Sequence, residues 1–376
     1  MKIGIITIHK IINFGSALQA YALQSYIQKQ FLSDVEIIDY IYPNKYHLSH
    51  RPQKDLRQRL LVKLREIKHY LTGNRTQKLY RNFYNEFFHL SPIKYNGPDE
   101  LMKQAPVYDI YITGSDQVWN INNLHNDPAM YCCFAPDKSI IVSYGASFST
   151  TTLPKSYYSS IRTRLNRYKS IGLREKSGID ILKDIGINNN IPICCNCDPT
   201  LLLNKSEYAP LAEKSSIKIN GDYILVYLLD YAYNPEPTIT EITQMAVNHY
   251  GCKVVRLLKT HFSYNGKMIV ITDAGPCEFL WLFQNAKHII TSSFHGTMFS
   301  VIFRKPFTTI IPDSSHLDCR SKDFLLRVGL NKCMASTDAT PVLHAENPYT
   351  DEVEIRIKEL ISDSQKYLKN IIKYET

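Results

Sequence analysis

A serine-rich turn around a single histidine is the part of this sequence best suited to chemistry. The run His288–Thr291 predicts a short buried strand, and it leads through Ser292-Ser293-Phe294-His295-Gly296 into a helical segment. A helix N-terminus at the end of a parallel strand offers free N–H groups and a favourable dipole to a phosphate or carboxylate. Ser292 and Ser293 would add hydroxyls, and Gly296 would let the backbone approach the ligand closely.

His295 lies within this turn, where an imidazole could donate or accept a proton. The alternative is a hydrogen-bonded loop histidine, with Ser292 or Ser293 acting only as helix N-caps. The turn therefore predicts an anion-binding site, with His295 as its candidate catalytic residue.

A second polar cluster follows another predicted strand, Ile110–Thr113. Ligands of open α/β sheets bind beyond the carboxyl ends of the strands. Asp116 and Gln117 could bind sugar hydroxyls there, and the ring of Trp119 could stack on the sugar. The alternative is an N-capping Asp116 beside a buried Trp119.

A third strand end carries Gly172-Leu173-Arg174-Glu175-Lys176-Ser177. The guanidinium of Arg174 is a planar fork suited to a carboxylate or phosphate. An arginine before a glutamate can equally form a surface ion pair, so this spacing alone does not choose between the two.

The elements that must position these residues begin with a βαβ unit. Lys2–Ile8 predicts a strand, Asn13–Ser16 a polar loop, and Ala17, Leu18, Tyr21, Ala22 and Ile27 lie at helical spacing before a strand at Val35–Tyr40. Such a unit implies a right-handed crossover and a parallel sheet. Further strands of this first domain, residues 1–204, are predicted at Ile110–Thr113, Ser139–Tyr144, Ser170–Leu173 and Ile191–Cys197.

A second series of strands follows a polar connector and predicts a second Rossmann-like domain over residues 205–345. Its strands are expected at Tyr223–Leu229, Val254–Leu258, His288–Thr291 and Phe307–Ile311. A helix from Val353 to about Ile372, within residues 346–376, would pack across the lobes or back on the first. The fold class is thus α/β, with two Rossmann-like lobes and parallel sheets.

One segment interrupts the first domain as a basic helical insertion near residues 50–90. Arg51–Arg81 carries ten Lys or Arg against two acidic residues, and one helical stripe contains Leu56, Leu60, Leu64, Ile67 and Leu71. Such helices can lie on acidic membrane surfaces, but a helix packed on its own domain has the same pattern.

Bulk properties restrict the class of protein. The length of 376 residues favours two domains, and no stretch has the character of a membrane span or signal peptide. Nine cysteines with adjacent pairs indicate a reducing cytoplasm, and the C-x-x-C of Cys194 and Cys197 lacks the second ligand pair of a zinc site. The net charge of +9 favours anions, but no zinc-finger, RRM or KH signature suggests nucleic acid.

These stretches occur in one order, together with Asn13–Tyr21 near the start and Asp198–Leu202 before the connector. This combination resembles the polysaccharide pyruvyl transferase family, from the first strand to Arg320–Leu326. The resemblance implies the two-lobed architecture of GT-B-type glycosyltransferases. It also implies transfer of the enolpyruvyl group of phosphoenolpyruvate to a sugar to form a pyruvate ketal, without a metal or another cofactor.

The resemblance assigns roles to single residues. His295 would be the general acid or base, and Asp116 is the second candidate catalytic residue. Phosphoenolpyruvate would be bound by Arg174, Ser292, Ser293, Gly296 and Arg320. The sugar acceptor would be bound by Asn13, Gly15, Gln117 and Trp119.

The turn departs from the commoner family pattern at one position. Many members carry Arg-Leu-His where this chain has Ser293-Phe294-His295, so an anion-binding arginine is missing two residues before the histidine. Arg320 or Arg304 could replace it. Loss of one charged hydrogen bond without compensation would cost on the order of 1.5–3 kcal/mol.

The expected function is therefore pyruvyl transfer in cell-surface polysaccharide biosynthesis. The acceptor would be a lipid-linked oligosaccharide at the inner face of the cell membrane, which the basic insertion could contact from the cytoplasm. Two alternatives stay open: a nucleotide-sugar-dependent glycosyltransferase, because fold does not fix function, and a non-catalytic protein that binds anionic glycans.

Overall fold

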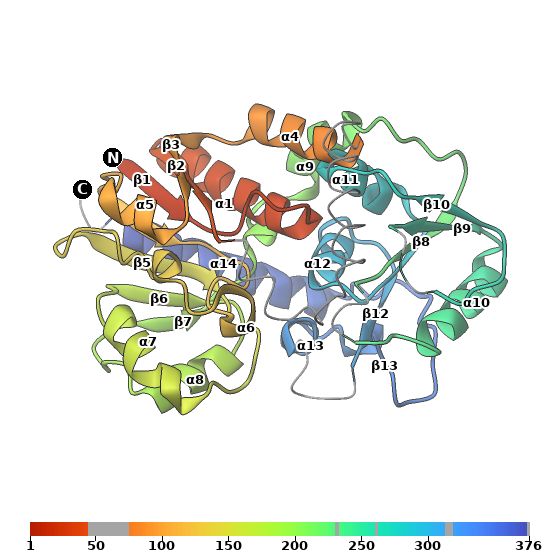
Figure 1. Ribbon diagram of the computed structural model, residues 1–376. Helices are drawn as coiled ribbons and strands as arrows, with labels where there is room; N and C mark the ends of the chain where they lie inside the picture. The colour runs from red at the N-terminus through yellow and green to blue at the C-terminus, as the bar shows by residue number, and fades with distance from the viewer. Residues whose placement is uncertain (44–74, 230–232, 259, 261, 313–318, 374–376) are drawn as a thin grey trace, which may run out of the picture.

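The computed structural model describes residues 1–43, 75–229, 233–258, 260, 262–312 and 319–373. Two α/β lobes lie side by side, the first at the left of Figure 1 and the second at the right. The predicted stripe from Leu56 to Leu71 lies outside the described residues. No helix in the described ranges is long and apolar enough to cross a membrane.

The first lobe is built on a sheet of seven parallel strands in the order β3-β2-β1-β4-β5-β6-β7. Its strands are β1 (Lys2–Ile6), β2 (Asp34–Ile41), β3 (Leu90–Asn96), β4 (Ile110–Thr113), β5 (Ile140–Ala146), β6 (Ser170–Leu173) and β7 (Ile193–Cys195). Its helices are α1 (Phe14–Phe31), α4 (Arg75–Phe87), α5 (Pro98–Lys103), α6 (Ile121–Leu124), α7 (Tyr158–Leu165) and α8 (Ser177–Ile185), with 3-10 turns η1 (Pro128–Tyr131), η2 (Lys155–Tyr157) and η3 (Pro199–Leu202).

The second lobe repeats this arrangement with six parallel strands in the order β10-β9-β8-β11-β12-β13. The strands are β8 (Tyr223–Tyr227), β9 (Lys253–Leu257), β10 (Met268–Ile271), β11 (His288–Thr291), β12 (Phe307–Ile311) and β13 (Met334–Ser336). The helices are α9 (Lys205–Glu213), α10 (Thr238–Tyr250), α11 (Pro276–Asn285), α12 (Phe294–Ile302), α13 (Cys319–Val328) and α14 (Asp351–Lys373), with η4 (Asn331–Cys333). The predicted class of two parallel-sheet Rossmann-like lobes is confirmed.

Three of these strands, β3, β10 and β13, were not predicted from the sequence. Each of them lies at an edge of its sheet, where only one side of the strand is paired with another described strand. β3 contains Pro92 and exposes several side chains, β10 is largely exposed, and β13 has three residues. The predicted insertion near residues 50–90 therefore ends where the chain rejoins the sheet at Leu90.

The strand order reverses between β1 and β4 in the first sheet and between β8 and β11 in the second. Each reversal leaves a crevice at the carboxyl ends of the strands, which is where open α/β sheets bind ligands. α1 begins in the first crevice and α12 begins in the second, and both helices lie near the centre of Figure 1. The fold thus directs two helix N-termini toward the junction of the lobes.

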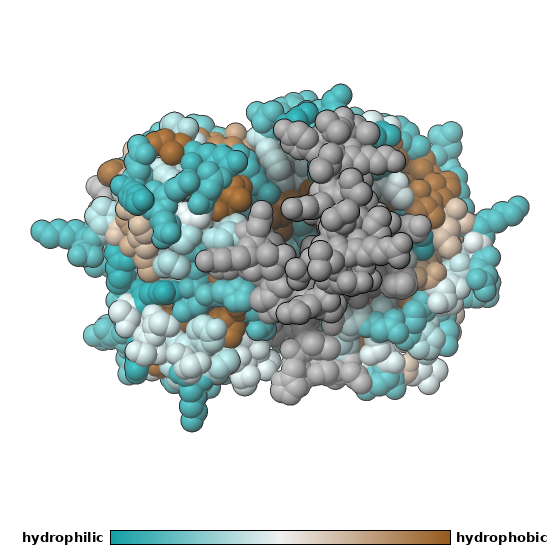
Figure 2. Space-filling model, in the orientation of Figure 1, coloured by the Kyte–Doolittle hydropathy of each residue, from teal (hydrophilic) through white to brown (hydrophobic). Residues whose placement is uncertain are grey.

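The two lobes share one hydrophobic core across this junction. The ring of Phe14, at the start of α1, lies 4.9 Å from Phe279 and 5.8 Å from Tyr227 of the second lobe, measured between ring centroids. Outside this junction, hydrophilic residues predominate on the described part of the face in Figure 2, where hydrophobic residues form separate small areas.

α14 runs behind both lobes in the view of Figure 1 and contacts each of them. Near its start, Glu354 forms an ion pair with Arg304 of the second lobe. Farther along, Ser364 accepts a hydrogen bond from the Cys197 backbone N–H, and the Tyr367 hydroxyl donates to the Ser143 carbonyl of the first lobe. The helix therefore bridges both sheets.

Candidate active site

The N-termini of α1 and α12 meet at His295, the first predicted catalytic residue. His295 is buried, and Gly15 of α1 packs directly on its ring. A Cβ atom added to Gly15 would lie 1.9 Å from His295 Nδ1, far inside van der Waals contact. Gly15, predicted as an acceptor-binding residue, therefore fixes the position of the histidine.

Asp198 lies on the other side of the imidazole and connects it to Arg174. Its Oδ2 is 3.5 Å from His295 Nε2 and accepts a hydrogen bond of 3.0 Å from Arg174 Nη1. Its Oδ1 accepts from the backbone and hydroxyl of Thr200, which makes Asp198 the N-cap of η3. Burial acts to raise the pKa of Asp198, but His295, Arg174 and Thr200 together outweigh it and hold this pKa well below the usual range.

Arg174 is a buried residue at the end of β6, not a surface ion pair. Its guanidinium lies 3.9 Å from Asp116 and 3.9 Å from Glu175, in addition to its bond with Asp198. Nε and Nη2 have no hydrogen-bond partner among the described residues. These two nitrogens face the carboxylates of Glu175 and Asp116, beyond hydrogen-bond distance.

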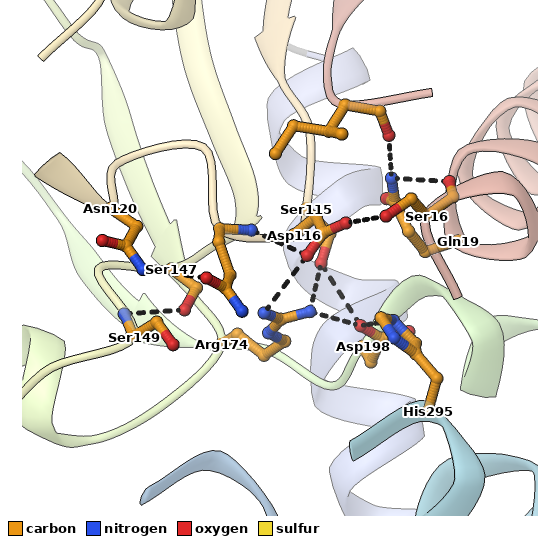
Figure 3. A network of polar contacts seen from close by, with 12 residues as sticks. Ser16, Gln19, Ser115, Asp116, Asn120, Ser147, Ser149, Arg174, Asp198 and His295 are labelled. Carbon is orange, nitrogen blue, oxygen red and sulfur yellow. Dashed lines mark hydrogen bonds and ion pairs between the residues drawn. The ribbon is translucent and has the colours of Figure 1, made fainter. Parts of the chain in front are cut away.

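Asp116 completes the network shown in Figure 3. Its backbone has a φ of 76°, a left-handed conformation that Asp tolerates better than most residues. Oδ2 accepts a hydrogen bond of 2.5 Å from Ser16 at the start of α1, and Oδ1 accepts from the Gln117 backbone N–H. The structure thus brings the predicted residues Asp116, Arg174 and His295 together around Asp198.

Phe294 provides an aromatic surface for two cations. The guanidinium carbons of Arg174, from the first lobe, and Arg320, from the second, lie 4.6 and 5.4 Å from its ring centroid. With its side-chain amide suitably oriented, Gln117 accepts hydrogen bonds of 3.0 and 3.1 Å from Arg320. Arg320 therefore supplies a guanidinium beside the turn that lacks an arginine at Ser293. Arg304 does not, because it pairs with Glu354 on α14.

Trp119 was predicted to stack on a sugar, and this prediction is wrong. Its side chain is only 1% exposed and packs against Tyr131 and Phe148 in the core of the first lobe. Its indole N–H donates to the Met130 carbonyl. A ring enclosed on these sides cannot face a ligand.

Several other predicted binding residues hold the fold in place. Ser293 caps α12 by accepting from the Gly296 N–H, and Asn13 caps α1 by accepting from the Ser16 N–H. Ser292 exchanges hydrogen bonds with the Leu229 backbone. The missing Cβ of Gly296 faces Thr291, 2.3 Å from its hydroxyl oxygen, so this glycine serves packing and not ligand approach.

Asp198, Ser16 and Glu175 are site residues that the sequence did not identify individually. Glu175 is buried next to Arg174, and burial raises its pKa although Arg174 and Ser147 act against this. Asp198-Pro199 directly follows a strand, and a capping Asp before Pro is a typical helix start. That signal could have placed Asp198 at the carboxyl edge of the sheet.

The fold and the junction site define a two-lobed α/β protein of the GT-B type. Among solved structures, UDP-GlcNAc 2-epimerase from Methanocaldococcus jannaschii is similar, with a TM-score of 0.55, 16% identity and full coverage of both chains. The corresponding enzyme from Rickettsia bellii has a TM-score of 0.54 and 12% identity, with 99% of this chain and 96% of that chain covered. At this identity, the similarity concerns the fold alone.

Comparison of the sequence with protein families identifies the family, which the structural similarity does not. The family model for polysaccharide pyruvyl transferase matches residues 13–314, which include Asp116, Arg174, Asp198 and His295 but not Arg320. A search of curated proteins gave no match. The chain belongs to the polysaccharide pyruvyl transferase family.

Proposed function

We propose that this protein transfers the enolpyruvyl group of phosphoenolpyruvate to a sugar hydroxyl and closes a pyruvate ketal during synthesis of a cell-surface polysaccharide. The observation that carries this proposal is the network at the lobe junction. His295 and Arg174 share the carboxylate of Asp198, and Arg174 and Arg320 converge on Phe294. One proton-transfer group therefore lies beside two cations.

The two guanidiniums suit a donor that carries both a carboxylate and a phosphate. Arg174 and Arg320 come from different lobes, and both guanidiniums lie over the ring of Phe294. Neither Ser292 nor Ser293 needs to leave its structural hydrogen bonds for this role.

The chemistry requires proton movements that the network can support. Protonation of the methylene carbon of phosphoenolpyruvate makes the neighbouring carbon electrophilic, and a sugar hydroxyl attacks it while losing its proton. The C–O bond to phosphate then breaks, phosphate leaves, and a second hydroxyl closes the ketal. His295 would transfer the proton to carbon, and Asp116 would accept protons from the hydroxyls.

Asp198 would keep both partners in place during these steps. Its Oδ2 lies 3.5 Å from His295 Nε2, and the hydrogen bond that it accepts from Arg174 fixes the guanidinium. The acceptor would be a lipid-linked oligosaccharide, with membrane contact through the basic segment Arg51–Arg81. Most of that segment lies outside the described residues.

The test is incubation with phosphoenolpyruvate and candidate acceptors, following phosphate release and the mass of one ketal-linked pyruvate on the sugar. We expect His295→Gln to reduce kcat by at least about 100-fold. His288→Gln is the matched control, because His288 is a buried histidine on the strand that leads to the same turn.

Equal turnover by His295→Gln and the parent would refute the catalytic assignment. Turnover of a nucleotide sugar instead of phosphoenolpyruvate would identify a glycosyltransferase. Retention of anionic glycans without turnover of either donor would identify a binding protein.

A further inference from the structure

A pocket lies between α14 and the amino-terminal ends of three strands of the first sheet. Its volume is about 500 Å³, which is within the range of small-molecule sites. The lining comes from the start of β5, β6 and β7 and from the last turns of α14. Arg174 follows the opposite end of β6, roughly 13 Å from Ser170 along an extended strand. The pocket is therefore separate from the proposed active site.

Small residues on the middle strand keep this space open. In the register of the sheet, Ser170 of β6 pairs with Val142 of β5, and Gly172 of β6 pairs with Cys194 of β7. Residues two apart on a strand point to the same face, so this face of β6 offers a serine and a glycine in place of larger side chains. The ring of Tyr367 on α14 packs on Gly172, and the pocket lies beside this contact.

The inner wall of the pocket is apolar or already hydrogen-bonded. Val142 and Ile371 are buried, and the Ser170 hydroxyl donates to the Pro192 carbonyl. The Cys194 thiol faces Asn196 Oδ1, and burial raises the pKa of this thiol to about 12, so it stays neutral. A ligand would therefore contact this wall through hydrocarbon groups.

The exposed part of the lining has a different character. Lys169 and Asn370 are its exposed polar residues, one before β6 and one on α14. Within the described ranges, neither side chain has a hydrogen bond or ion pair, and no acidic side chain lines the pocket. One ammonium group matches the single charge of a carboxylate better than the charge of about −1.5 to −2 on a phosphate monoester.

We propose that this pocket binds a fatty acid, with its hydrocarbon chain along the inner wall and its carboxylate at Lys169 and Asn370. The Lys169 ammonium and the Asn370 amide would each donate a hydrogen bond to a carboxylate oxygen. This inference does not rest on pyruvyl transfer, because the pocket and the proposed active site share no residue.

Calorimetric titration with hexanoate, octanoate and decanoate tests the apolar part of the site. Each added pair of methylene groups should lower the Kd by about tenfold, because both groups leave water for the groove. Decylamine has the same chain with a positive head group, so it should bind at least about tenfold more weakly than decanoate. Absence of decanoate binding, or equal affinity for the three acids, would overturn the proposal.

Two substitutions in the lining locate the ligand. Lys169→Gln should weaken decanoate binding by about three- to fivefold, as expected for a partly exposed ion pair. The matched control is Lys183→Gln, because Lys183 is an exposed lysine on α8 that does not line the pocket. Cys194→Leu places a larger apolar side chain in the groove and should weaken decanoate binding at least about tenfold. Unchanged binding in Cys194→Leu, or equal Kd values for the two lysine variants, would refute the site.

Two controls concern folding and a competing occupant. Circular dichroism verifies that each variant is folded, and Ile140→Trp on the same wall provides a second filling variant if Cys194→Leu is not. Sedimentation velocity tests whether a second copy of the chain covers the groove. A parent dimer that Cys194→Leu dissociates would identify that copy as the occupant and overturn the fatty-acid site.

Turnover measurements separate this inference from the proposed function. Lys169→Gln and Cys194→Leu should turn over phosphoenolpyruvate and acceptor as the parent does, because neither residue belongs to the network around Asp198. Decanoate binding without turnover of phosphoenolpyruvate would support this site and refute the proposed function alone. Turnover by a parent that binds no decanoate would refute this site alone.

Discussion

Asp198 is the residue on which the site depends most, because it contacts partners from both lobes. Its Oδ2 faces Arg174 of the first lobe and His295 of the second, and its Oδ1 caps η3 through Thr200. One buried carboxylate therefore combines a structural cap with the alignment of a cation and a proton-transfer group.

Asp198→Asn separates these two roles. Asparagine also caps helices through its Oδ1, so η3 should persist, while the negative charge between Arg174 and His295 is lost. We expect kcat to fall by at least about 100-fold, and the free energy of unfolding to fall by about 3–5 kcal/mol, as when a buried pair loses one partner. Steady-state kinetics and urea unfolding measure the two effects.

The pH dependence of stability gives a further check on this variant. The folded-state pKa of Asp198 is lowered, so its contribution is complete above the unfolded-state pKa and is lost as the pH falls toward the folded value. The stability difference between parent and Asp198→Asn should be constant above about pH 5 and shrink below about pH 4. A difference that persists unchanged at lower pH would show that the carboxylate charge is not the cause.

The sequence predicted the positions of the catalytic candidates better than the roles of their neighbours. Asp116 and Arg174 follow strands of one parallel sheet, whose carboxyl ends share one edge, so their proximity could be foreseen. His295 follows a strand of the second sheet, and its meeting with them depends on the packing of the two lobes. The burial of Trp119 could not be foreseen from the sequence, because it depends on the packing of Tyr131 and Phe148 around the indole ring. For Ser293, the capping alternative could be stated but not chosen before the helix start was seen.

At the scale of elements, two helix N-termini meet at close range. α1 presents Gly15 to the imidazole of His295 on α12, and Ser16 of the same turn donates to Asp116. The start of α1 therefore positions both proposed proton-transfer groups, although it belongs to the other lobe from α12.

Gly15→Ala should displace His295. The added methyl would lie within 2.6 Å of three ring atoms of the imidazole, a distance that real Cβ contacts do not show. We expect kcat to fall by at least about tenfold, as is typical when a reacting group is misplaced. Alanine favours helices over glycine, so any loss of activity would not come from a weaker α1.

A double-mutant cycle with His295→Ala provides the control for this prediction. His295→Ala removes the ring with which the new methyl collides, so Gly15→Ala should have little additional effect on activity in that background. Additive effects of the two substitutions would mean that Gly15 acts through something other than the histidine.

The strands missed by sequence analysis all lie at sheet edges, and this has a physical reason. β10 exposes Ile269 and Val270, and β3 includes Pro92, whose lack of an N–H is tolerated where a strand has only one neighbour. Central strands such as β8 are buried on both faces and give continuous apolar runs. The edge strands β3, β10 and β13 lack that signal, whereas the edge strand β7 was predicted within Ile191–Cys197.

At the scale of the whole molecule, the lobes are joined by more than the connector. Phe14 of the first lobe packs among aromatic rings of the second, and α14 hydrogen-bonds to the first lobe after pairing with Arg304 of the second. Since one hydrophobic cluster contains buried residues of both lobes and of α14, we expect the lobes to unfold together.

The two tryptophans allow this expectation to be tested, because Trp119 lies in the first lobe and Trp281 in the second. Leu368→Ala should destabilise the protein by about 2–5 kcal/mol, since Leu368 is fully buried on α14 beside Tyr367, which bonds to the first lobe. Urea unfolding is followed by fluorescence in the single-tryptophan variants Trp119→Phe and Trp281→Phe, each with and without Leu368→Ala. Cooperative unfolding predicts that Leu368→Ala shifts the urea midpoint equally for both tryptophan reporters. The two lobes share one hydrophobic core, so unfolding of one lobe exposes core residues of the other. A shift confined to the Trp119 reporter would instead show that the second lobe remains folded without the first.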